Sequence, residues 1–394
     1  MNILLLGTGM QGKAALHDLA TDPAVTRIVA ADRDLFALRS EIRDRGYGEK
    51  VVCETLDAAD HRAIEALVGE GHDVVIDLLP VSYIGRVAAA AVAHKVHLVN
   101  TFYVVPDLAK LDRKAMRAGI TILPEFGMDP GIDLVMLGDM VRSFDEVDEI
   151  LSYGAGIPEP EAADNAIRYK VSWTFEGVLR SYMRPAVLLE NGEVVELNDR
   201  VQFRPENLHY LELPGVGILE AFPNGNAVAY VTELGLDPAK MRKAGRYAMR
   251  YPGHGAFWAT MVDLGLLDDA TTTVDGVAVN HRRYLASVLE PRLQYRPNER
   301  DLSIIRVEVA GRRGRKRVRM VREVIDRRDL STGLTAMSRT VGYTAAIGAR
   351  MILDGSVSKR GIVSPVSDVP YAPFVQALAA RGITIEERLE QAPA

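Results

Sequence analysis

The chain has 394 residues, of which 48% are hydrophobic and 25% charged, and its formal net charge is −6. This length suits two connected domains rather than one core, and the acidic balance excludes a general attraction to nucleic acid or an anionic membrane. The single cysteine, Cys53, excludes an intrachain disulfide framework; with no apolar run of about 20 residues and no basic leader, we expect a cytoplasmic protein.

The N-terminal segment carries a nucleotide-binding pattern. Residues 1–6 form a continuous apolar run, typical of a strand buried on both faces of a parallel sheet. The run leads into Gly7-Thr-Gly-Met-Gln-Gly12 and then into a segment with helical spacing. Gly7 allows a tight turn, Gly9 lets the backbone approach a pyrophosphate, and Gly12 lets the helix pack closely on its strand. We therefore predict cofactor contacts at these three glycines and at Met10.

A second predicted strand, 27–31, ends at Asp32. An acid about 20 residues beyond the glycines binds the ribose hydroxyls of the adenosine. Its carboxylate would repel a 2′-phosphate, which favours NAD over NADP. The adjacent Arg33 is a further candidate cofactor contact and leaves NADP possible.

Strands and helices continue to alternate as far as residue 123. Repeated units of this length predict a Rossmann-type, doubly wound parallel sheet in an α/β protein. The predicted strands are 50–54, 72–79, 96–100 and 120–123, and the predicted helices are 59–69, 85–94 and 105–118. Since such sheets bind ligands at their strand ends, we predict further cofactor contacts at the residues there, which are Asp57, Leu79, Pro80 and Asn100.

The stretch 124–133 joins the predicted cofactor half to a substrate half. Pro130 fixes one φ angle and Gly131 permits unusual ones, so this turn should hold its shape and present Asp129 to a cleft. Many short strands with few helices follow, and they predict an α+β substrate-binding and dimerisation domain, 124–335, on a mostly antiparallel sheet.

Two later segments complete the predicted organisation. The basic run 311–319 lies between strand-like segments, and we interpret it as a solvated hairpin rather than a nucleic-acid patch. Residues 335–353 are rich in glycine and alanine and predict a helix pressed against another element. We expect this helix to return to the nucleotide domain, which would then combine 1–123 with 336–394.

Several motifs resemble the saccharopine dehydrogenase family over essentially the whole chain. Those similar to its glutamate-forming saccharopine dehydrogenases are 100–108, 119–133, 152–158, 169–173 and 335–343. Others are more similar to its lysine 6-dehydrogenase branch, namely the compact length and the motifs 250–254, 274–279, 285–291 and 306–311.

Two departures from the glutamate-forming pattern bear on the substrate and the cofactor. Gly225 stands where those enzymes carry an arginine that binds the glutamate carboxylate, and a glycine cannot replace that bidentate partner. Asp32 stands near the position where they tend to have a basic residue for NADP. Both favour an NAD enzyme for a smaller amino acid, with L-lysine the leading candidate, whereas the turn around Asp129 resembles the saccharopine branch. A glutamate-forming saccharopine dehydrogenase and a non-catalytic nucleotide-binding sensor are the alternatives.

The resemblance implies oxidation of a carbon–nitrogen bond by hydride transfer to nicotinamide, after which water opens the imine. From lysine this reaction would give the 6-semialdehyde and ammonia. It implies no metal, a small amino-acid substrate, no nucleic-acid or membrane partner, and a homodimer.

Candidate substrate residues follow from this chemistry. Asp129 could pair with the substrate ammonium and orient the water, and Tyr103 could bond the amine or the carboxylate, so both are catalytic candidates. Trp173, Asn224 and His254 are candidates for substrate binding, and each has an ordinary structural role as its alternative. Two cationic candidates for the substrate carboxylate are Arg250 and Arg339.

Overall fold

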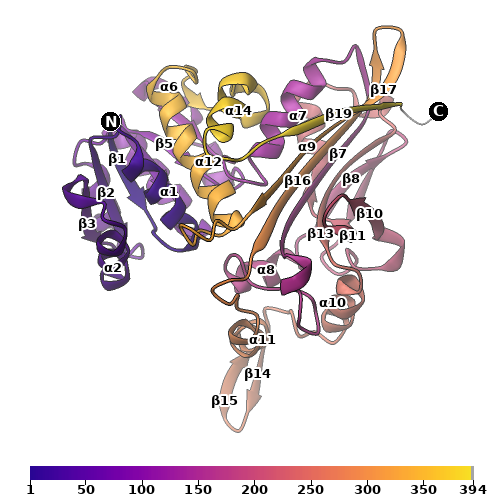
Figure 1. Ribbon diagram of the computed structural model, residues 1–394, viewed down its shortest axis with the longest axis horizontal. Helices are drawn as coiled ribbons and strands as arrows, with labels where there is room; N and C mark the ends of the chain where they lie inside the picture. Colours follow the sequence, from indigo (N-terminus) through magenta and orange to yellow (C-terminus); the bar gives the residue numbers. More distant parts are fainter. Residues whose placement is uncertain (392–394) are drawn as a thin grey trace. The chain divides into compact units, whose positions relative to one another are not determined.

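The computed structural model describes residues 1–391 and divides into two compact units. The first unit combines Met1–Asp139 with Ser338–Thr384, and the second combines Met140–Met337 with the C-terminal segment from Ile385 (Figure 1). In the described part of the chain, no helix is long and apolar enough to span a bilayer.

The first unit is built on a seven-stranded sheet whose neighbours all pair in parallel, which confirms the predicted doubly wound fold. The strand order is β18-β6-β5-β4-β1-β2-β3. The strands are β1 (Asn2–Leu6), β2 (Arg27–Asp32), β3 (Val51–Thr55), β4 (Val74–Asp77), β5 (His97–Asn100), β6 (Thr121–Leu123) and β18 (Gly361–Ile362).

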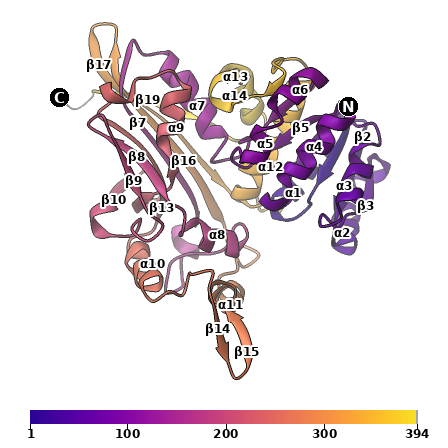
Figure 2. The same cartoon turned by 180° about the vertical axis from the view of Figure 1, so that it is seen from behind.

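Helices cover this sheet, as Figures 1 and 2 show from opposite sides. They are α1 (Met10–Thr21), α2 (Leu35–Arg45), α3 (His61–Val68), α4 (Ile84–His94), α5 (Pro106–Ala109), α6 (Asp112–Ala118), α13 (Pro365–Asp368) and α14 (Tyr371–Ala379). The predicted helix 105–118 is therefore two helices. A tighter turn separates them, in which the amide of Leu111 donates to the carbonyl of Leu108 at 2.9 Å.

Two helices include residues of both units. In α7 (Ile132–Arg142), which follows the turn 124–131, the first unit ends at Asp139, and in α12 (Ala336–Leu353) it resumes at Ser338. The glycines of α12 permit close packing, because a Cβ on Gly342 would lie 2.5 Å from the carbonyl oxygen of Gln11 in α1. The small-residue helix is thus pressed against another element, as its composition predicts.

The second unit is built on a ten-stranded sheet with the main order β10-β11-β13-β7-β16-β17-β19, to which β8, β9 and β12 add a branch. Most pairs are antiparallel, as predicted, but β13 pairs with β7 and β12 with β8 in parallel, so the sheet is mixed. The strands are β7 (Glu146–Pro158), β8 (Ala186–Glu190), β9 (Glu193–Leu197), β10 (His209–Leu213), β11 (Gly217–Pro223), β12 (Gly225–Asn226), β13 (Lys243–Arg250), β16 (Asp301–Arg313), β17 (Lys316–Arg327) and β19 (Glu386–Gln391).

Four helices and a separate two-stranded ribbon complete the second unit. The helices are α8 (Phe175–Ser181), α9 (Ala227–Glu233), α10 (His254–Asp263) and α11 (His281–Leu289), and the ribbon pairs β14 (Thr271–Val274) with β15 (Val277–Asn280). The basic run 311–319 lies in the hairpin of β16 and β17.

The division into units differs from the predicted domain boundaries at two places. Residues 124–139 group with the first unit, because the turn after β6 is hydrogen-bonded to the loop after β5. At the other end, β19 joins the second sheet, because its backbone pairs antiparallel with β17 from Val318↔Gln391 to Glu323↔Glu386. The expectation that 385–394 belongs to the nucleotide domain is therefore wrong for the described residues 385–391.

Candidate functional site

The turn between β1 and α1 has the shape that its glycines predict. Gly7 has φ +88°, and a Cβ there would lie 2.8 Å from the carbonyl oxygen of Leu78. A Cβ on Gly12 would lie 2.1 Å from the carbonyl oxygen of Gly7, so both positions exclude a side chain for reasons internal to the fold. Gly9 differs, because a Cβ there would meet nothing within 4 Å. Its missing side chain leaves open space beside the N-terminus of α1, where an anion is favoured.

Asp32 at the end of β2 is held against this turn. One carboxylate oxygen accepts from the amide of Thr8 at 2.6 Å and from its hydroxyl at 3.0 Å, and the other accepts from the amide of Asp34 at 3.1 Å. These bonds fix the carboxylate beside the turn and leave acceptor capacity on it, since an ionised carboxylate offers about four acceptor positions. Asp32 can therefore accept a bond from a ribose hydroxyl.

A cavity of about 210 Å³ opens at this point. Residues of the glycine turn, β2 and α2 line it, namely Thr8, Gly9, Met10, Lys13, Asp32, Asp34, Ala37, Leu38 and Glu41. Glu41 is paired with Lys13 at 3.1 Å and hydrogen-bonded to Arg45. Burial raises the pKa of Glu41, but the hydrogen bonds from Arg45 and Lys13 outweigh it and hold the pKa below its usual value. The lining thus carries three carboxylates and one lysine that is already paired.

These residues fit the adenosine half of a pyridine dinucleotide. The open space at Gly9 suits a pyrophosphate on the N-terminus of α1, and Asp32 suits the ribose beside it. Met10, a predicted cofactor contact, also lines the cavity, whereas the predicted contacts Arg33 and Asp57 are exposed and do not line it.

Two buried polar side chains lie at the ends of β4 and β5. Asp77 and Asn100 are register partners on adjacent strands, so they point to the same face of the sheet. Asp77 accepts from the amide of Leu79 at 3.1 Å, and Asn100 accepts from the amide of Phe102 at 3.1 Å. The second carboxylate oxygen of Asp77 and the amide nitrogen of Asn100 have no hydrogen-bond partner among the described residues. Burial raises the pKa of Asp77 to about 7, although the Leu79 amide opposes the shift.

The predicted catalytic residues lie in neighbouring loops of the first unit. Tyr103 is half-buried after β5, and Asp129 is half-buried in the turn after β6. Two backbone bonds join these loops: the amide of Glu125 donates to Phe102 at 2.9 Å, and the amide of Phe126 donates to Asn100 at 3.0 Å.

The turn that carries Asp129 is closed by its own backbone. The amide of Gly127 donates to Pro130 at 2.9 Å, and the amide of Gly131 donates to the carboxylate of Asp133 at 2.8 Å. Gly131 has φ +146°, and a Cβ there would lie 2.1 Å from the carbonyl oxygen of Gly127. The turn therefore requires glycine at this position.

The second unit contains a buried guanidinium. Arg250 is 6% exposed and lies 5.2 Å above the ring of Tyr169. One of its terminal nitrogens donates to the carbonyl of Met249 at 2.7 Å, while its Nε has no hydrogen-bond partner among the described residues. No described carboxylate lies within ion-pair distance of Arg250. An unpaired buried charge is costly, so this position favours an anionic partner.

His254 belongs to the aromatic cluster around Arg250. Its Nε2 lies 2.8 Å from the hydroxyl of Tyr182, and its ring packs edge-on against Tyr182 and Tyr169. Burial, together with the positive charge of Arg250, holds the pKa of His254 well below its usual value. The imidazole is thus neutral and fixed by a structural hydrogen bond.

The other predicted substrate residues are spread over both units. Trp173 is half-buried before α8, and a Cβ on Gly177 would lie 2.6 Å from its ring. Asn224 is half-buried after β11, and its amide donates to the carbonyl of Arg246 at 2.8 Å. Arg339, in the first unit, donates to the carbonyl of Arg381 at 3.1 Å and stacks on Tyr343.

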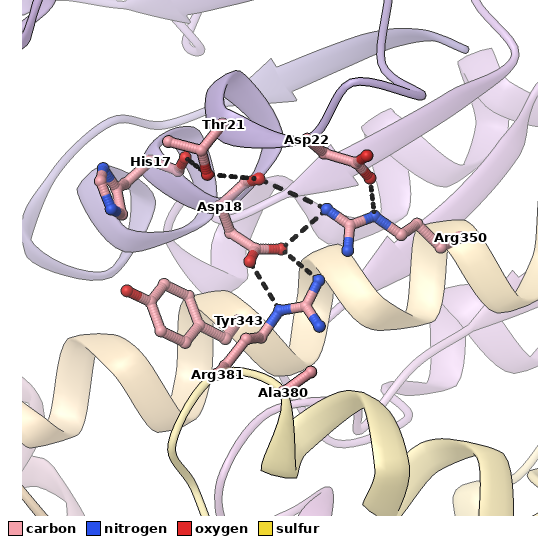
Figure 3. A pocket seen from close by; sticks show the side chains of 8 residues that line it. All are labelled: His17, Asp18, Thr21, Asp22, Tyr343, Arg350, Ala380 and Arg381. Atoms are coloured by element: carbon pink, nitrogen blue, oxygen red, sulfur yellow. Dashed lines mark hydrogen bonds and ion pairs between the residues drawn. The ribbon is translucent and has the colours of Figure 1, made fainter.

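A second cavity of the first unit, about 350 Å³, is lined by residues of α1, of α12 and of the segment after α14 (Figure 3). Arg381 donates to both carboxylate oxygens of Asp18 at 2.6 and 3.0 Å, and Arg350 pairs with Asp18 at 3.1 Å and with Asp22 at 2.5 Å. Burial raises the pKa of Asp18 despite these arginines. The charges satisfy one another, so the cluster joins α12 and the segment after α14 to the nucleotide-binding helix.

Sequence reasoning missed several residues of the first unit's site. Lys13, Asp34 and Glu41 reach the cavity from α1 and the start of α2, and no local motif marks them. Asp77 is missed because, in the sequence, an acid at the end of a strand resembles an exposed loop residue. The signal that could have indicated its burial is the apolar run Val74–Ile76 directly before it, which pairs with the equally apolar strand β5.

Family models match nearly the whole chain. The model described as saccharopine dehydrogenase NADP binding domain matches residues 3–123, and the one described as saccharopine dehydrogenase C-terminal domain matches residues 127–383. Among solved structures, apo saccharopine dehydrogenase (L-Glu forming) from Saccharomyces cerevisiae is similar, with a TM-score of 0.84, 24% identity and coverage of 98% of this chain and 99% of that one.

Curated relatives include proteins of two sizes. The chain is 26% identical to a Schizosaccharomyces pombe protein named saccharopine dehydrogenase (NADP(+), L-glutamate-forming), over 98% of this chain and 99% of the relative. It is 27% identical to the mitochondrial alpha-aminoadipic semialdehyde synthase of Bos taurus over 97% of its own length, but it spans only 47% of that relative.

Proposed function

Because the chain belongs to the saccharopine dehydrogenase family, we propose that it oxidises the carbon–nitrogen bond of an amino acid, most specifically L-lysine at its 6-amino group, with NAD as the cofactor. The cofactor, when bound, supplies the hydride-accepting nicotinamide. The residues of the chain bind and orient the reactants and accept the proton that the substrate ammonium loses.

The first unit holds the cofactor through the glycine turn and the strand ends. The N-terminus of α1 at Gly9 would hold the pyrophosphate, and Asp32 would hold the adenosine ribose. Leu79, Pro80 and Asn100, which follow or end β4 and β5, would support the nicotinamide half.

The single observation that carries the preference for NAD is the acidic lining of the adenosine-side cavity. Asp32, Asp34 and Glu41 face it, and the one lysine of the lining, Lys13, is paired with Glu41. Two unit charges about 5 Å apart repel by about 3 kcal/mol at an effective dielectric constant of about 20. A 2′-phosphate would therefore bind at least about a hundredfold more weakly than a hydroxyl. The family's NADP-binding description applies to the domain, and this lining supports NAD for this chain.

The carboxylate of the amino acid is the natural partner of Arg250. A guanidinium that is buried without an ion-pair partner gains a bidentate, charge-assisted bond when it binds a carboxylate. Tyr182 lies beside it, and His254 positions Tyr182 through the 2.8 Å bond. Trp173 and Asn224 remain proposed substrate contacts of the second unit.

Asp129 and Tyr103 are the proposed catalytic residues. Asp129 pairs with the substrate ammonium, takes part in its deprotonation and stabilises the iminium that forms. Tyr103 bonds the amine from the adjacent loop. The closed turn from Gly127 to Gly131 supports this role, because it fixes the backbone that carries Asp129.

Oxidation of saccharopine is the second candidate, and the named relatives favour it. Gly225 argues against this candidate, because by resemblance it stands where the glutamate-forming enzymes carry an arginine that binds the glutamate carboxylate. Gly225 has φ +85°, a backbone conformation that disfavours any other side chain. The second glutamate carboxylate of saccharopine therefore lacks that partner.

A substrate screen tests the proposal. NADH and NADPH formation is followed with lysine, saccharopine, ornithine and a diamine. We expect NADH formation with lysine, little with the diamine, which lacks the carboxylate for Arg250, and slow rates with NADP. Oxidation of saccharopine without oxidation of lysine would overturn the lysine assignment.

A further inference from the structure

Asp77 and Asn100 are two polar members of a largely apolar face of the parallel sheet. They end the adjacent strands β4 and β5 as register partners, and they are 1% and 0% exposed. Strand alternation and register place them on the same face as five residues of one hydrophobic cluster, namely Leu4, Leu6, Val75, Leu98 and Ile122. Polar atoms in such surroundings are costly unless they are hydrogen-bonded, so each of them needs a partner.

Each of the two side chains uses only one of its polar atoms within its own loop. One carboxylate oxygen of Asp77 accepts from the amide of Leu79, and the side-chain oxygen of Asn100 accepts from the amide of Phe102, both at 3.1 Å. The bond from Phe102 fixes the orientation of the Asn100 carboxamide, because only its oxygen can accept. The atoms left over are an acceptor oxygen on Asp77 and a donor nitrogen on Asn100. Neither of them has a hydrogen-bond partner within residues 1–391.

The two leftover atoms are chemically complementary and belong to adjacent side chains. Neighbouring strands lie about 4.8 Å apart, and register partners on one face of a sheet are therefore neighbours. A single buried water would satisfy both atoms, because it can accept from the nitrogen of Asn100 and donate to the oxygen of Asp77. The pair can thus join the end of β4 to the end of β5.

The loops after these two strands carry the proposed functional groups of the first unit. Leu79 and Pro80 follow β4, and Tyr103 follows β5. Two backbone hydrogen bonds join the loop after β5 to the turn that carries Asp129. A link between the strand ends therefore fixes the loop proposed to support the nicotinamide relative to both proposed catalytic residues. Such placement matters in hydride transfer, because an error of about 1 Å can lower a rate by about a hundredfold.

We propose that Asp77 is a positioning residue, which acts through Asn100 to hold the loop after β4 against the loop after β5 in the arrangement that the nicotinamide half of the cofactor requires. Both side chains are buried, so the effect passes through the loops rather than through a direct contact with the cofactor. This inference rests on the proposed function, which places the nicotinamide at this edge of the sheet. The adenosine half, at the glycine turn and Asp32, does not depend on the pair.

A reciprocal exchange of the two side chains tests the proposal. Asp77→Asn places two donor nitrogens opposite each other, and Asn100→Asp places two carboxylates opposite each other. The double variant Asp77→Asn/Asn100→Asp restores one donor and one acceptor. Every variant keeps the oxygen that accepts from its own loop. The matched control is Asp60→Asn, because Asp60 is exposed and likewise accepts from an amide two residues later, that of Arg62, at 2.9 Å.

Calorimetric titration with NADH and with ADP-ribose, which lacks the nicotinamide, gives the readout. The titrations are run at pH 8, because burial raises the pKa of Asp77 to about 7 and the carboxylate is then ionised. Each single variant should bind NADH about tenfold more weakly, as expected for one lost hydrogen bond, and should bind ADP-ribose as the wild type does. The double variant should recover most of the NADH affinity, and Asp60→Asn should change neither Kd.

Three results would each overturn the proposal. They are unchanged NADH binding in Asp77→Asn, equal weakening of NADH and ADP-ribose, which a merely structural role would give, and a double variant that binds NADH no better than the single ones. Melting curves identify a variant that does not fold, and Asp77→Asn with the double variant decides the outcome if Asn100→Asp is such a variant. Failure of the proposed function is a separate result, because these titrations need no amino acid. If the wild type prefers NADPH, the same comparison uses NADPH and 2′-phospho-ADP-ribose.

Discussion

Replacing Asp77 with asparagine should change how the stability of the protein depends on pH. Asp77 is 1% exposed, and burial raises its pKa to about 7 from an ordinary value of 3.8. Between pH 5 and pH 7 the unfolded chain has released this proton while the folded protein keeps it. The wild-type free energy of unfolding therefore falls as the pH rises through this window, by about 1.4 kcal/mol per pH unit from this group alone.

The variant removes this contribution while keeping an oxygen that accepts from the Leu79 amide. We therefore compare the free energy of unfolding of the variant with that of the wild type. The difference, Asp77→Asn minus wild type, should rise by about 2–3 kcal/mol from pH 5 to pH 7 and stay constant above pH 8. Urea denaturation followed by circular dichroism at pH 5, 6, 7 and 8 measures this difference. The subtraction cancels the contributions of other titrating groups, such as Asp301, whose pKa burial raises to about 6.

Asp57→Asn is the matched control for this measurement. Asp57 is exposed, and its carboxylate accepts from the amide of Ala59, two residues later, at 3.0 Å, just as Asp77 accepts from Leu79. Because Asp57 is exposed, its variant measures the effect of the same substitution without the burial that raises the pKa of Asp77. A stability difference for Asp77→Asn that does not vary with pH would refute the reasoning about burial at the end of β4.

Four further variants test the sites. Gly9→Ala should weaken NAD binding by about tenfold or more, because its Cβ would occupy the open space proposed for the pyrophosphate, and it should leave the stability unchanged. Gly12→Ala should instead destabilise the fold, because its Cβ would lie 2.1 Å from a carbonyl oxygen. Calorimetric titration with NAD and melting curves distinguish the two effects. Arg250→Lys should raise KM for the amino acid by about tenfold or more and leave the Kd for NAD unchanged, since an ammonium cannot replace the bidentate guanidinium; an unchanged KM would exclude the carboxylate role. Asp129→Asn should lower kcat by about a hundredfold with NAD affinity preserved, and full activity in that variant would refute its catalytic role.

The nucleotide-binding fold could be predicted because its signals are local. A largely apolar strand, a glycine turn and an acid at the end of the next strand follow one another within 32 residues, and each reflects a steric or electrostatic need of the same turn. The position of Asp32 against Thr8 follows from this local order.

Other features could not be predicted because they depend on contacts distant in the sequence. The residues 386–391 carry no apolar strand pattern, and β19 is held at the sheet edge by backbone pairing with β17 and by the ion pair of Glu387 with Arg322. Lys13 and Glu41 meet at the cavity only because the fold brings one residue of α1 and one of α2 together there. The burial of Asp77 and the unpaired state of Arg250 depend on several strands and helices, so the sequence marks the residues without revealing their environments.

The central claim is that the acidic lining of the first unit's cavity selects NAD in an amino-acid dehydrogenase. Isothermal titration of NADH and NADPH into the same protein tests it most directly, because binding does not depend on the identity of the substrate. We predict a Kd for NADPH at least about a hundredfold above that for NADH, and a much smaller ratio in Asp32→Ser. Equal affinities, or tighter binding of NADPH to the wild type, would contradict the account.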